Sequence, residues 1–436
     1  MTTTFDHLSQ RLETIVASGL TGSVAGTDGA AITVVDFAAP VGAVCEIERV
    51  GCRPLVGEVI GFREHAAIVF PSGDLSGVRR GAAVRLRRSC RLIPVGRGLL
   101  GRVLDAEGKP LDDRPQPITG RRRALVQPPP AACERPPIDQ PLCTGVRAID
   151  GLLTCGRGQR VGLFSGSGVG KSTLLGMMAR HTSADVNVVA LIGERGREVN
   201  EFLQRDLSPE ALARTVVVVS TSDEPALARV QAALAATTIA EHFRDEGADV
   251  LLLMDSLTRF ATAQRELALA AGEPAAARGF PPSVFAALPR LVERAGRSAC
   301  GSITAFYTVL VDGDDLDEPI SDAVRGLLDG HVVLSRKLAA RGHWPAIDVL
   351  NSVSRLAPTL TDREHQASAM RLRALMSARR EHDDLISIGA YRSGSQPDVD
   401  EALAKQSGIE SFLTQPIDER ASLGASRQML LELSAR

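Results

Sequence analysis

A glycine-rich segment at residues 165–172 is the feature of this sequence that most limits how the chain can fold. The segment contains, in order, Ser165, Gly166, Ser167, Gly168, Val169, Gly170, Lys171 and Ser172. It lies between an apolar run at 161–164 and a stretch with helical character at 171–181. A strand, a glycine-rich turn and a helix in this order are typical of a phosphate-binding loop, or P-loop. The sequence therefore predicts an α/β fold with an anion site where one strand ends.

The residue types of the predicted loop suit phosphate chemistry. Glycine has no Cβ atom, so the backbone can curl and direct successive N–H groups at phosphate oxygens. The N-terminus of the helix that continues through Thr173 adds a dipole that favours an anion. We expect Lys171 to reach the β- and γ-phosphates of a nucleotide and the Ser172 hydroxyl to bind Mg²⁺. Ser165 stands where the motif has its first glycine, and a residue this small still allows the turn.

Two further apolar runs lead into carboxylates. Residues 187–192 are followed closely by Glu194, and residues 250–254 are followed by Asp255. Ligands of open parallel sheets bind beyond the carboxyl ends of the strands, where Lys171 is also expected. Asp255 is a candidate to hold Mg²⁺, although many buried strands end in an aspartate that only caps a helix. The convergence of the three side chains predicts a nucleotide hydrolase.

The rest of the chain divides into regions of different character. Short β-rich runs separated by turn signals fill residues 21–94 and predict a small β-barrel. Apolar runs alternate with helical stretches over residues 95–357, which predicts a parallel sheet covered by helices. Residues 358–436 are helical in character and lack strands. The expected strands are 31–35, 43–47, 56–60, 66–70 and 83–86, then 160–164, 187–192, 216–220, 249–254, 303–309 and 331–334. The expected helices of the central region include 171–181, 224–244 and 256–270.

Residues 1–20 precede the barrel and predict an amphipathic helix. The apolar residues that share one face of that helix are Phe5, Leu8, Leu12, Ile15 and Val16. The helix either packs on its own domain or docks a partner, and the pattern favours neither.

Composition excludes several classes of protein. Of the 436 residues, 44% are hydrophobic and 23% are charged, which excludes a disordered or collagen-like chain. The net charge of -2 and the 3% aromatic content argue against a nucleic-acid partner. No apolar run reaches the roughly 18 residues of a membrane-spanning helix, and the N-terminus lacks the features of a signal peptide. The seven cysteines contain no CxxC pair, so we expect buried, reduced thiols in a cytosolic chain and no zinc site.

Several linked motifs resemble the catalytic subunits of rotary ATP synthases and their relatives. Besides the P-loop, they are residues 95–102 (VGRGLLGR), 193–198 (GERGRE), 255–260 (DSLTRF) and 344–348 (WPAID). Within that superfamily, three further segments resemble the flagellum-specific and type III secretion export ATPases. These segments are 318–323 (EPISDA), 329–335 (DGHVVLS) and 389–395 (GAYRSGS). The P-loop letters and the last of these segments favour the flagellar branch.

The resemblance implies roles for individual residues in a RecA-like ATPase domain. Glu194 would be the general base that orients the attacking water, with Arg195 in the same loop and Arg259 as a supporting charge. Arg355 would be an arginine finger that reaches the nucleotide of the neighbouring subunit. Trp344 would stack on the adenine. Read without the family, Arg259 and Arg355 could be ordinary surface arginines and Trp344 could be a core residue.

The resemblance also implies an assembly and a function. Glu194 and Arg355 occur in one chain, so each copy could hydrolyse its own ATP and complete its neighbour's site in a homohexameric ring. We expect a Mg²⁺-dependent ATPase that energises the export of flagellar proteins. Alternatives are a virulence type III secretion ATPase, a synthase catalytic subunit and a hexameric RNA helicase. The synthase's acidic C-terminal stretch is missing, with residues 382–386 (HDDLI) nearest to it, and residues 21–92 hold three Phe but no Tyr or Trp.

Partners are implied by the resemblance alone. The N-terminal helix would bind a stator-like regulatory protein. The C-terminal helical domain would face export-gate membrane proteins and client–chaperone complexes. The chain is expected in the cytoplasm, peripheral at the inner face of the cell membrane.

Overall fold

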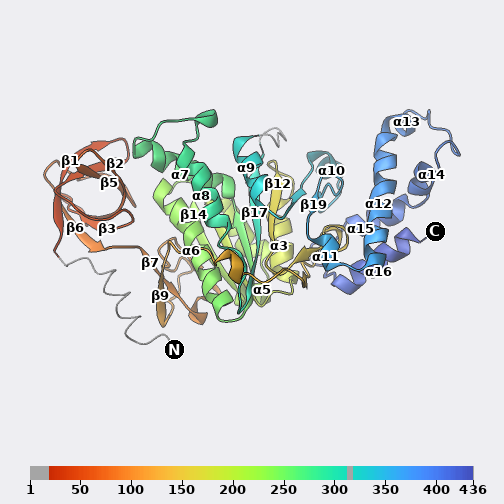
Figure 1. Ribbon diagram of the computed structural model, residues 1–436, viewed down its shortest axis with the longest axis horizontal. Coiled ribbons are helices and arrows are strands. Elements are labelled where there is room, and N and C mark those ends of the chain that lie inside the picture. Colours follow the sequence, from red (N-terminus) through yellow and green to blue (C-terminus); the bar gives the residue numbers. More distant parts are fainter. Residues whose placement is uncertain (1–18, 312–317, 436) are drawn as a thin grey trace.

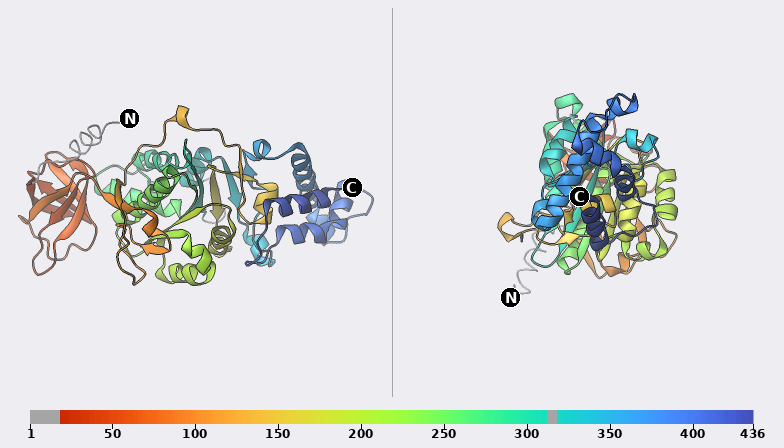
Figure 2. Two further views of the ribbon diagram at one scale, coloured as in Figure 1. Left: turned by 90° about the horizontal axis from the view of Figure 1, so that it is seen from below. Right: turned by 90° about the vertical axis from the view of Figure 1, so that its right-hand side faces the viewer.

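The computed structural model describes residues 19–311 and 318–435. A β-barrel, a central α/β domain and a helical C-terminal region follow one another along the long axis (Figures 1 and 2). This arrangement confirms the predicted fold class. The helix predicted for residues 5–18 lies outside the described residues.

The barrel contains one strand that the sequence pattern missed. Its six strands close in the order β1-β2-β5-β4-β3-β6. They are β1 (Thr21–Asp28), β2 (Ala31–Val35), β3 (Val44–Ile47), β4 (Leu55–Arg63), β5 (Ala66–Pro71) and β6 (Ala83–Arg88). Within β1 only Val24 is buried, so the strand shows no apolar alternation. Pairing with β2 on one side and β6 on the other places β1 and closes the barrel.

A nine-stranded sheet forms the centre of the molecule. Its strands lie in the order β19-β18-β12-β17-β15-β13-β14-β8, and β16 pairs with β17. They are β8 (Arg102–Leu104), β12 (Arg160–Ser165), β13 (Val186–Glu194), β14 (Thr215–Thr221), β15 (Asp249–Asp255), β16 (Gly296–Arg297), β17 (Ser302–Leu310), β18 (Gly330–Val333) and β19 (Val353–Ser354). From β18 to β8 the neighbouring strands are parallel, as predicted. The pattern missed β8, β16 and β19, which are too short to show a period.

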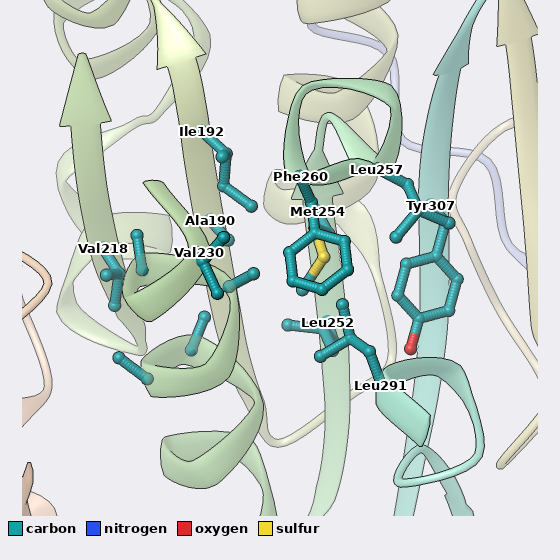
Figure 3. Packing of buried hydrophobic residues seen from close by; sticks show 14 of the residues in the cluster. Ala190, Ile192, Val218, Val230, Leu252, Met254, Leu257, Phe260, Leu291 and Tyr307 are labelled. Carbon is teal, nitrogen blue, oxygen red and sulfur yellow. The ribbon is translucent and has the colours of Figure 1, made fainter. Parts of the chain in front are cut away.

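Helices cover both faces of this sheet and bury two apolar layers. One face packs against α6 (Ala226–Asp245), α7 (Leu257–Ala270), α8 (Pro282–Val292) and α9 (Pro319–Leu327). The other face packs against α2 (Arg147–Leu152), α3 (Lys171–His181), α4 (Gly196–Glu201) and α5 (Pro209–Ala213). In the first layer, Leu252 and Met254 of β15 lie beneath Phe260 and Leu291 (Figure 3). Burial on both faces explains why the strands read as continuous apolar runs.

The C-terminal region is helical and is anchored to the central domain. Its helices are α11 (Ala357–Leu360), α12 (Arg363–Glu381), α13 (Asp383–Ser387), α14 (Pro397–Ala404), α15 (Gln406–Leu413) and α16 (Leu423–Ser434). The buried Arg147 of α2 donates to the carbonyls of Phe412 and Thr414 and pairs with Glu419. Five hydrogen-bond donors on one planar group let arginine satisfy several acceptors at such a junction. Within residues 19–311 and 318–435, no helix combines the length and the apolar character needed to cross a membrane.

The cysteine prediction was right about pairing and partly wrong about burial. All seven cysteines are free. Cys45 and Cys155 are buried, but Cys52, Cys133 and Cys300 are exposed. These three cysteines lie outside the regular strands and α-helices, so no periodic pattern of apolar residues predicted whether they are buried or exposed.

A matched pair of leucines tests the packing of the first apolar layer. Leu291→Ala should lower the free energy of unfolding by about 2–5 kcal/mol, because the side chain is 1% exposed and leaves a cavity. Leu269→Ala removes the same atoms from a side chain that is 43% exposed and should cost less than about 0.5 kcal/mol. Urea unfolding measures both, and equal midpoints for the two variants would contradict the packing described here.

Candidate active site

The P-loop joins the end of β12 to the start of α3. Gly168 and Gly170 have φ values of 75° and 80°, in the left-handed region that side-chain-bearing residues rarely adopt. Gly166 does not lie in that region. A Cβ atom there would instead meet the guanidinium of Arg336. Ser172 and Thr173 occupy the first turn of α3 and are partly buried.

Lys171 joins the two predicted carboxylates. Its Nζ lies 2.5 Å from Oδ1 of Asp255 and 3.3 Å from Oε1 of Glu194. β12, β15 and β13 are parallel, so their carboxyl ends share one edge of the sheet. We call these three residues the lysine–carboxylate cluster. Its members come from positions 171, 194 and 255 and meet only because of the strand order.

The charges of the cluster shift the pKa values of its members. Burial lowers the pKa of Lys171, but Asp255 and Glu194 outweigh it and hold the pKa above its ordinary value. Burial raises the pKa of Glu194, the charge of Lys171 opposes that rise, and a hydrogen bond with Glu198 adds to it. The net result is a Glu194 pKa above the ordinary carboxyl value. A base with a raised pKa takes up a proton closer to neutral pH.

Arg259 of α7 faces the cluster. Its Nε lies 3.8 Å from Oε1 of Glu194. A Cβ atom on Gly193 would lie 2.6 Å from Cδ of Arg259, so glycine at this position allows the arginine to approach. Gly193 also has a φ of 67°. Arg259 therefore lies where the expected supporting charge would act on Glu194.

Thr308 is a site residue that sequence reasoning missed. Its hydroxyl donates to Oδ1 of Asp255 at 2.7 Å, and the side chain is fully buried on β17. Asp255 Oδ1 thus accepts hydrogen bonds from the Thr308 hydroxyl and the Lys171 ammonium, and the two bonds fix the orientation of the carboxylate. A hydroxyl near the end of an apolar strand was visible in the sequence, but only the pairing of β17 with β15 brings it to Asp255.

The oxygen donors of the site suit Mg²⁺. The Ser172 hydroxyl and the Asp255 carboxylate are hard ligands of the kind that Mg²⁺ prefers, with phosphates and waters completing its shell. In the described ranges, no three or more His, Cys, Asp or Glu side chains gather as a metal cage.

Trp344 lies beside the last glycine of the P-loop. A Cβ atom on Gly170 would lie 2.7 Å from Cζ3 of the indole. The side chain is 42% exposed, so the alternative of a core tryptophan is wrong.

Two predicted site residues lie away from the lysine–carboxylate cluster. The Arg195 side chain is 75% exposed and faces Glu198 at 3.5 Å, on the solvent side of α4. Arg355 is exposed beyond β19, and its N–H donates to the carbonyl of Asp329. Asp329 in turn pairs with Arg160 at the first residue of β12. Arg355 is therefore at the amino edge of the sheet, about 16 Å along β12 from the P-loop.

A P-loop on a parallel sheet, with carboxylates at the neighbouring strand ends, defines a P-loop ATPase, and comparison with known proteins specifies which kind. Residues 145–354 match the nucleotide-binding domain of the ATP synthase alpha/beta family. Residues 361–432 match the C-terminal domain of the T3SS EscN ATPase. The chain therefore belongs to the ATP synthase alpha/beta family, in the branch of the flagellar and type III secretion ATPases.

Individual relatives cover nearly the whole chain. The flagellum-specific ATP synthase of Salmonella typhimurium is 49% identical over 440 residues, covering 98% of this chain and 96% of that protein. The type 3 secretion system ATPase of Xanthomonas euvesicatoria is 46% identical over 428 residues, covering 98% and 97%. The assembled ATPase EscN of enteropathogenic E. coli superimposes with a TM-score of 0.90 at 45% identity, covering 95% of this chain and 100% of that one. EscN has also been solved with its central stalk EscO, with a TM-score of 0.88.

The hydrogen bond between Glu194 and Glu198 predicts a shift in pH dependence. Because this bond helps to raise the pKa of Glu194, Glu198→Gln should lower that pKa. Glu194 would then lose its proton at a lower pH, and the acid limb of the ATPase pH profile should move to lower pH. Glu201→Gln, at a partly exposed residue of the same helix that pairs with Arg197, should leave the limb in place. A limb that shifts equally in both variants, or in neither, would refute this assignment.

Proposed function

We propose that this chain is a Mg²⁺-dependent ATPase that energises the export of flagellar proteins through a type III secretion apparatus. The observation that carries the proposal is the contact of Lys171 with both Glu194 and Asp255 beside a P-loop. The names of the relatives supply the biological setting, and they support a virulence type III secretion system equally well.

In the proposed reaction, the chain's own groups bind the triphosphate and aim water at it. Backbone N–H groups of the P-loop and the Lys171 ammonium hold the phosphate oxygens and stabilise the charge that develops on them. Glu194 accepts a hydrogen bond from the attacking water and takes its proton. Ser172 and Asp255 would hold Mg²⁺, which neutralises phosphate charge when bound. The incoming phosphates compete with the carboxylates for Lys171, and this competition frees Glu194 to meet the water.

The remaining predicted residues have supporting roles in the proposal. The exposed indole of Trp344 is available to stack on the adenine. Arg195 pairs with Glu198, which is hydrogen-bonded to Glu194, so it supports the base indirectly. We also propose three domains, a β-barrel at residues 21–94, an ATPase domain at 95–357 and a helical domain at 358–436, with residues 1–20 as a docking segment.

Arg355 supports a composite site between subunits. It lies at the opposite edge of the sheet from its own P-loop, and an arginine side chain does not span about 16 Å. A planar, permanently charged group in this position suits the nucleotide of an adjacent copy. We propose a homohexameric ring, consistent with the assembled state of EscN.

The proposed partners extend this assembly. The EscN–EscO complex supports a central-stalk protein as a partner of the ring. We also propose a stator-like protein at residues 1–20, and export-gate proteins and client–chaperone complexes at the C-terminal helices. The setting would be cytoplasmic and peripheral at the inner face of the cell membrane.

The other candidate functions fit less well. A synthase catalytic subunit is disfavoured because residues 361–432 match the EscN C-terminal domain. An RNA helicase would need aromatic side chains on the barrel, whereas Phe37 and Phe70 are buried there and Phe62 alone is an exposed phenylalanine among residues 21–94.

Replacing the proposed base tests the chemistry directly. Glu194→Gln keeps the shape of the side chain but removes its basicity, so kcat should fall about a hundredfold or more. Nucleotide binding, followed with fluorescent mant-ADP, should change much less. Glu201→Gln is the matched control and should keep the wild-type rate. Turnover at the wild-type rate in Glu194→Gln would refute the assignment.

The same variant tests the biological role when it replaces the wild-type gene in the source bacterium. Loss of flagellar filaments and motility would support flagellar export. Normal motility with loss of secreted virulence proteins would assign the chain to an injectisome instead. Normal motility together with normal secretion would refute both.

Mixing inactive subunits tests the composite site. Arg355→Ala subunits retain an intact P-loop, and Lys171→Ala subunits retain the arginine, so mixed rings should recover part of the ATPase rate. Arg355→Ala mixed with the double variant Lys171→Ala/Arg355→Ala should recover none, because that mixture contains no finger. No recovery at any ratio in the first mixture would show that Arg355 does not act between subunits.

A further inference from the structure

Gly166 is confined by a side chain from a distant part of the sequence. A Cβ atom on Gly166 would lie 2.5 Å from Nη2, 2.6 Å from Nε and 2.9 Å from Cζ of Arg336. The guanidinium therefore occupies the space that any larger residue would need. Gly168, whose φ is 75°, has open space where its Cβ would be. Thus backbone conformation favours glycine at 168, whereas a Cβ atom at 166 would force the guanidinium of Arg336 to move.

The other end of the P-loop is confined by the same segment. Arg336 opens α10 (Arg336–Ala340), and Trp344 lies just beyond the end of that helix. The indole of Trp344 fills the space beside Gly170, 2.7 Å from where its Cβ would lie. Residues 336–344 thus contact the first and last glycines of the loop. We call these residues the α10 segment.

The α10 segment and the residues just after it are joined to the C-terminal region by hydrogen bonds and an ion pair. The backbone N–H of Gln415 donates to the carbonyl of Trp344 at 2.9 Å. Just beyond the segment, Asp348 pairs with Arg380 of α12 at 3.3 Å. Arg373 of the same helix donates to the Val349 carbonyl. Figure 1 shows α10 between the central sheet and the C-terminal helices.

We propose that Arg336 is a positioning residue that holds the first turn of the P-loop, in a clamp whose second arm is Trp344. This inference rests on the proposed function, because the clamp acts on the loop that binds the nucleotide. A guanidinium packed beside Gly166 restricts the motion of the loop backbone there. The N–H groups of the loop are then already aimed before the phosphates arrive, which lowers the entropic cost of binding. The C-terminal helices carry the anchor of the clamp, so their movement would change nucleotide affinity.

Removing the Arg336 side chain should weaken nucleotide binding. Arg336→Ala in the full chain should raise the Kd for mant-ADP about tenfold, by freeing the loop. The KM for ATP should rise by a similar factor while kcat changes less than about threefold, because the contact acts in the ground state and the transition state alike. Lys337→Ala removes the same charge from the next residue of α10 and should bind like the wild type.

A double-mutant cycle separates the clamp from general damage to the loop. Gly166→Ala should raise the Kd about tenfold in the wild type, because the new methyl displaces the guanidinium. In the Arg336→Ala background it should raise the Kd about twofold or less, because nothing is left to displace. Gly168→Ala is the matched control: its strain comes from φ, so its effect should be equal in both backgrounds.

The outcomes distinguish the clamp from the function on which it rests. Wild-type protein that fails to bind mant-ADP would overturn the proposed function and the clamp together. Wild-type protein that binds, with an Arg336→Ala variant that binds equally well, would overturn the clamp alone. Equal effects of Gly166→Ala in both backgrounds would also overturn it. Smaller effects of Gly166→Ala in the Arg336→Ala background would support the clamp.

Discussion

The shared carboxyl edge of the parallel strands is the constraint on which this molecule depends. β12, β15 and β13 end there side by side, so Lys171 can meet two carboxylates that are distant in sequence. Unpaired charges at such depth would be strongly destabilising, so the contacts of Lys171 with Glu194 and Asp255 offset that cost. The same pairing holds Glu194 and Asp255 at this edge.

Arg259 and Arg355 differ in where they lie relative to the carboxyl edge of the sheet. Arg259 approaches the edge from α7 and contacts Glu194, whereas Arg355 lies at the opposite edge, beside the start of β12. In the proposed composite site, Glu194 and Arg355 lie at opposite edges of one sheet, so a second copy would supply the arginine. The geometry of a single chain therefore already argues for assembly.

The segment after β18 connects the nucleotide site to the rest of the chain. Its first residues contact the P-loop, and its later residues bind the C-terminal helices through Gln415, Arg373 and Arg380. Hydrogen bonds and an ion pair join the two regions, so a displacement of one would act on the other through these contacts. Nucleotide state and the position of the C-terminal helices would then depend on each other.

The sequence by itself determined the P-loop, the long central strands and the two carboxylates, because each depends on a local pattern of glycines or of apolar runs. It did not determine β1, whose burial is confined to Val24, or the short edge strand β19. It also left Thr308 and Arg336 unassigned, although both contact the site. Only the tertiary structure decided these features, because they depend on which strands pair and which distant side chains approach, and no local pattern records that.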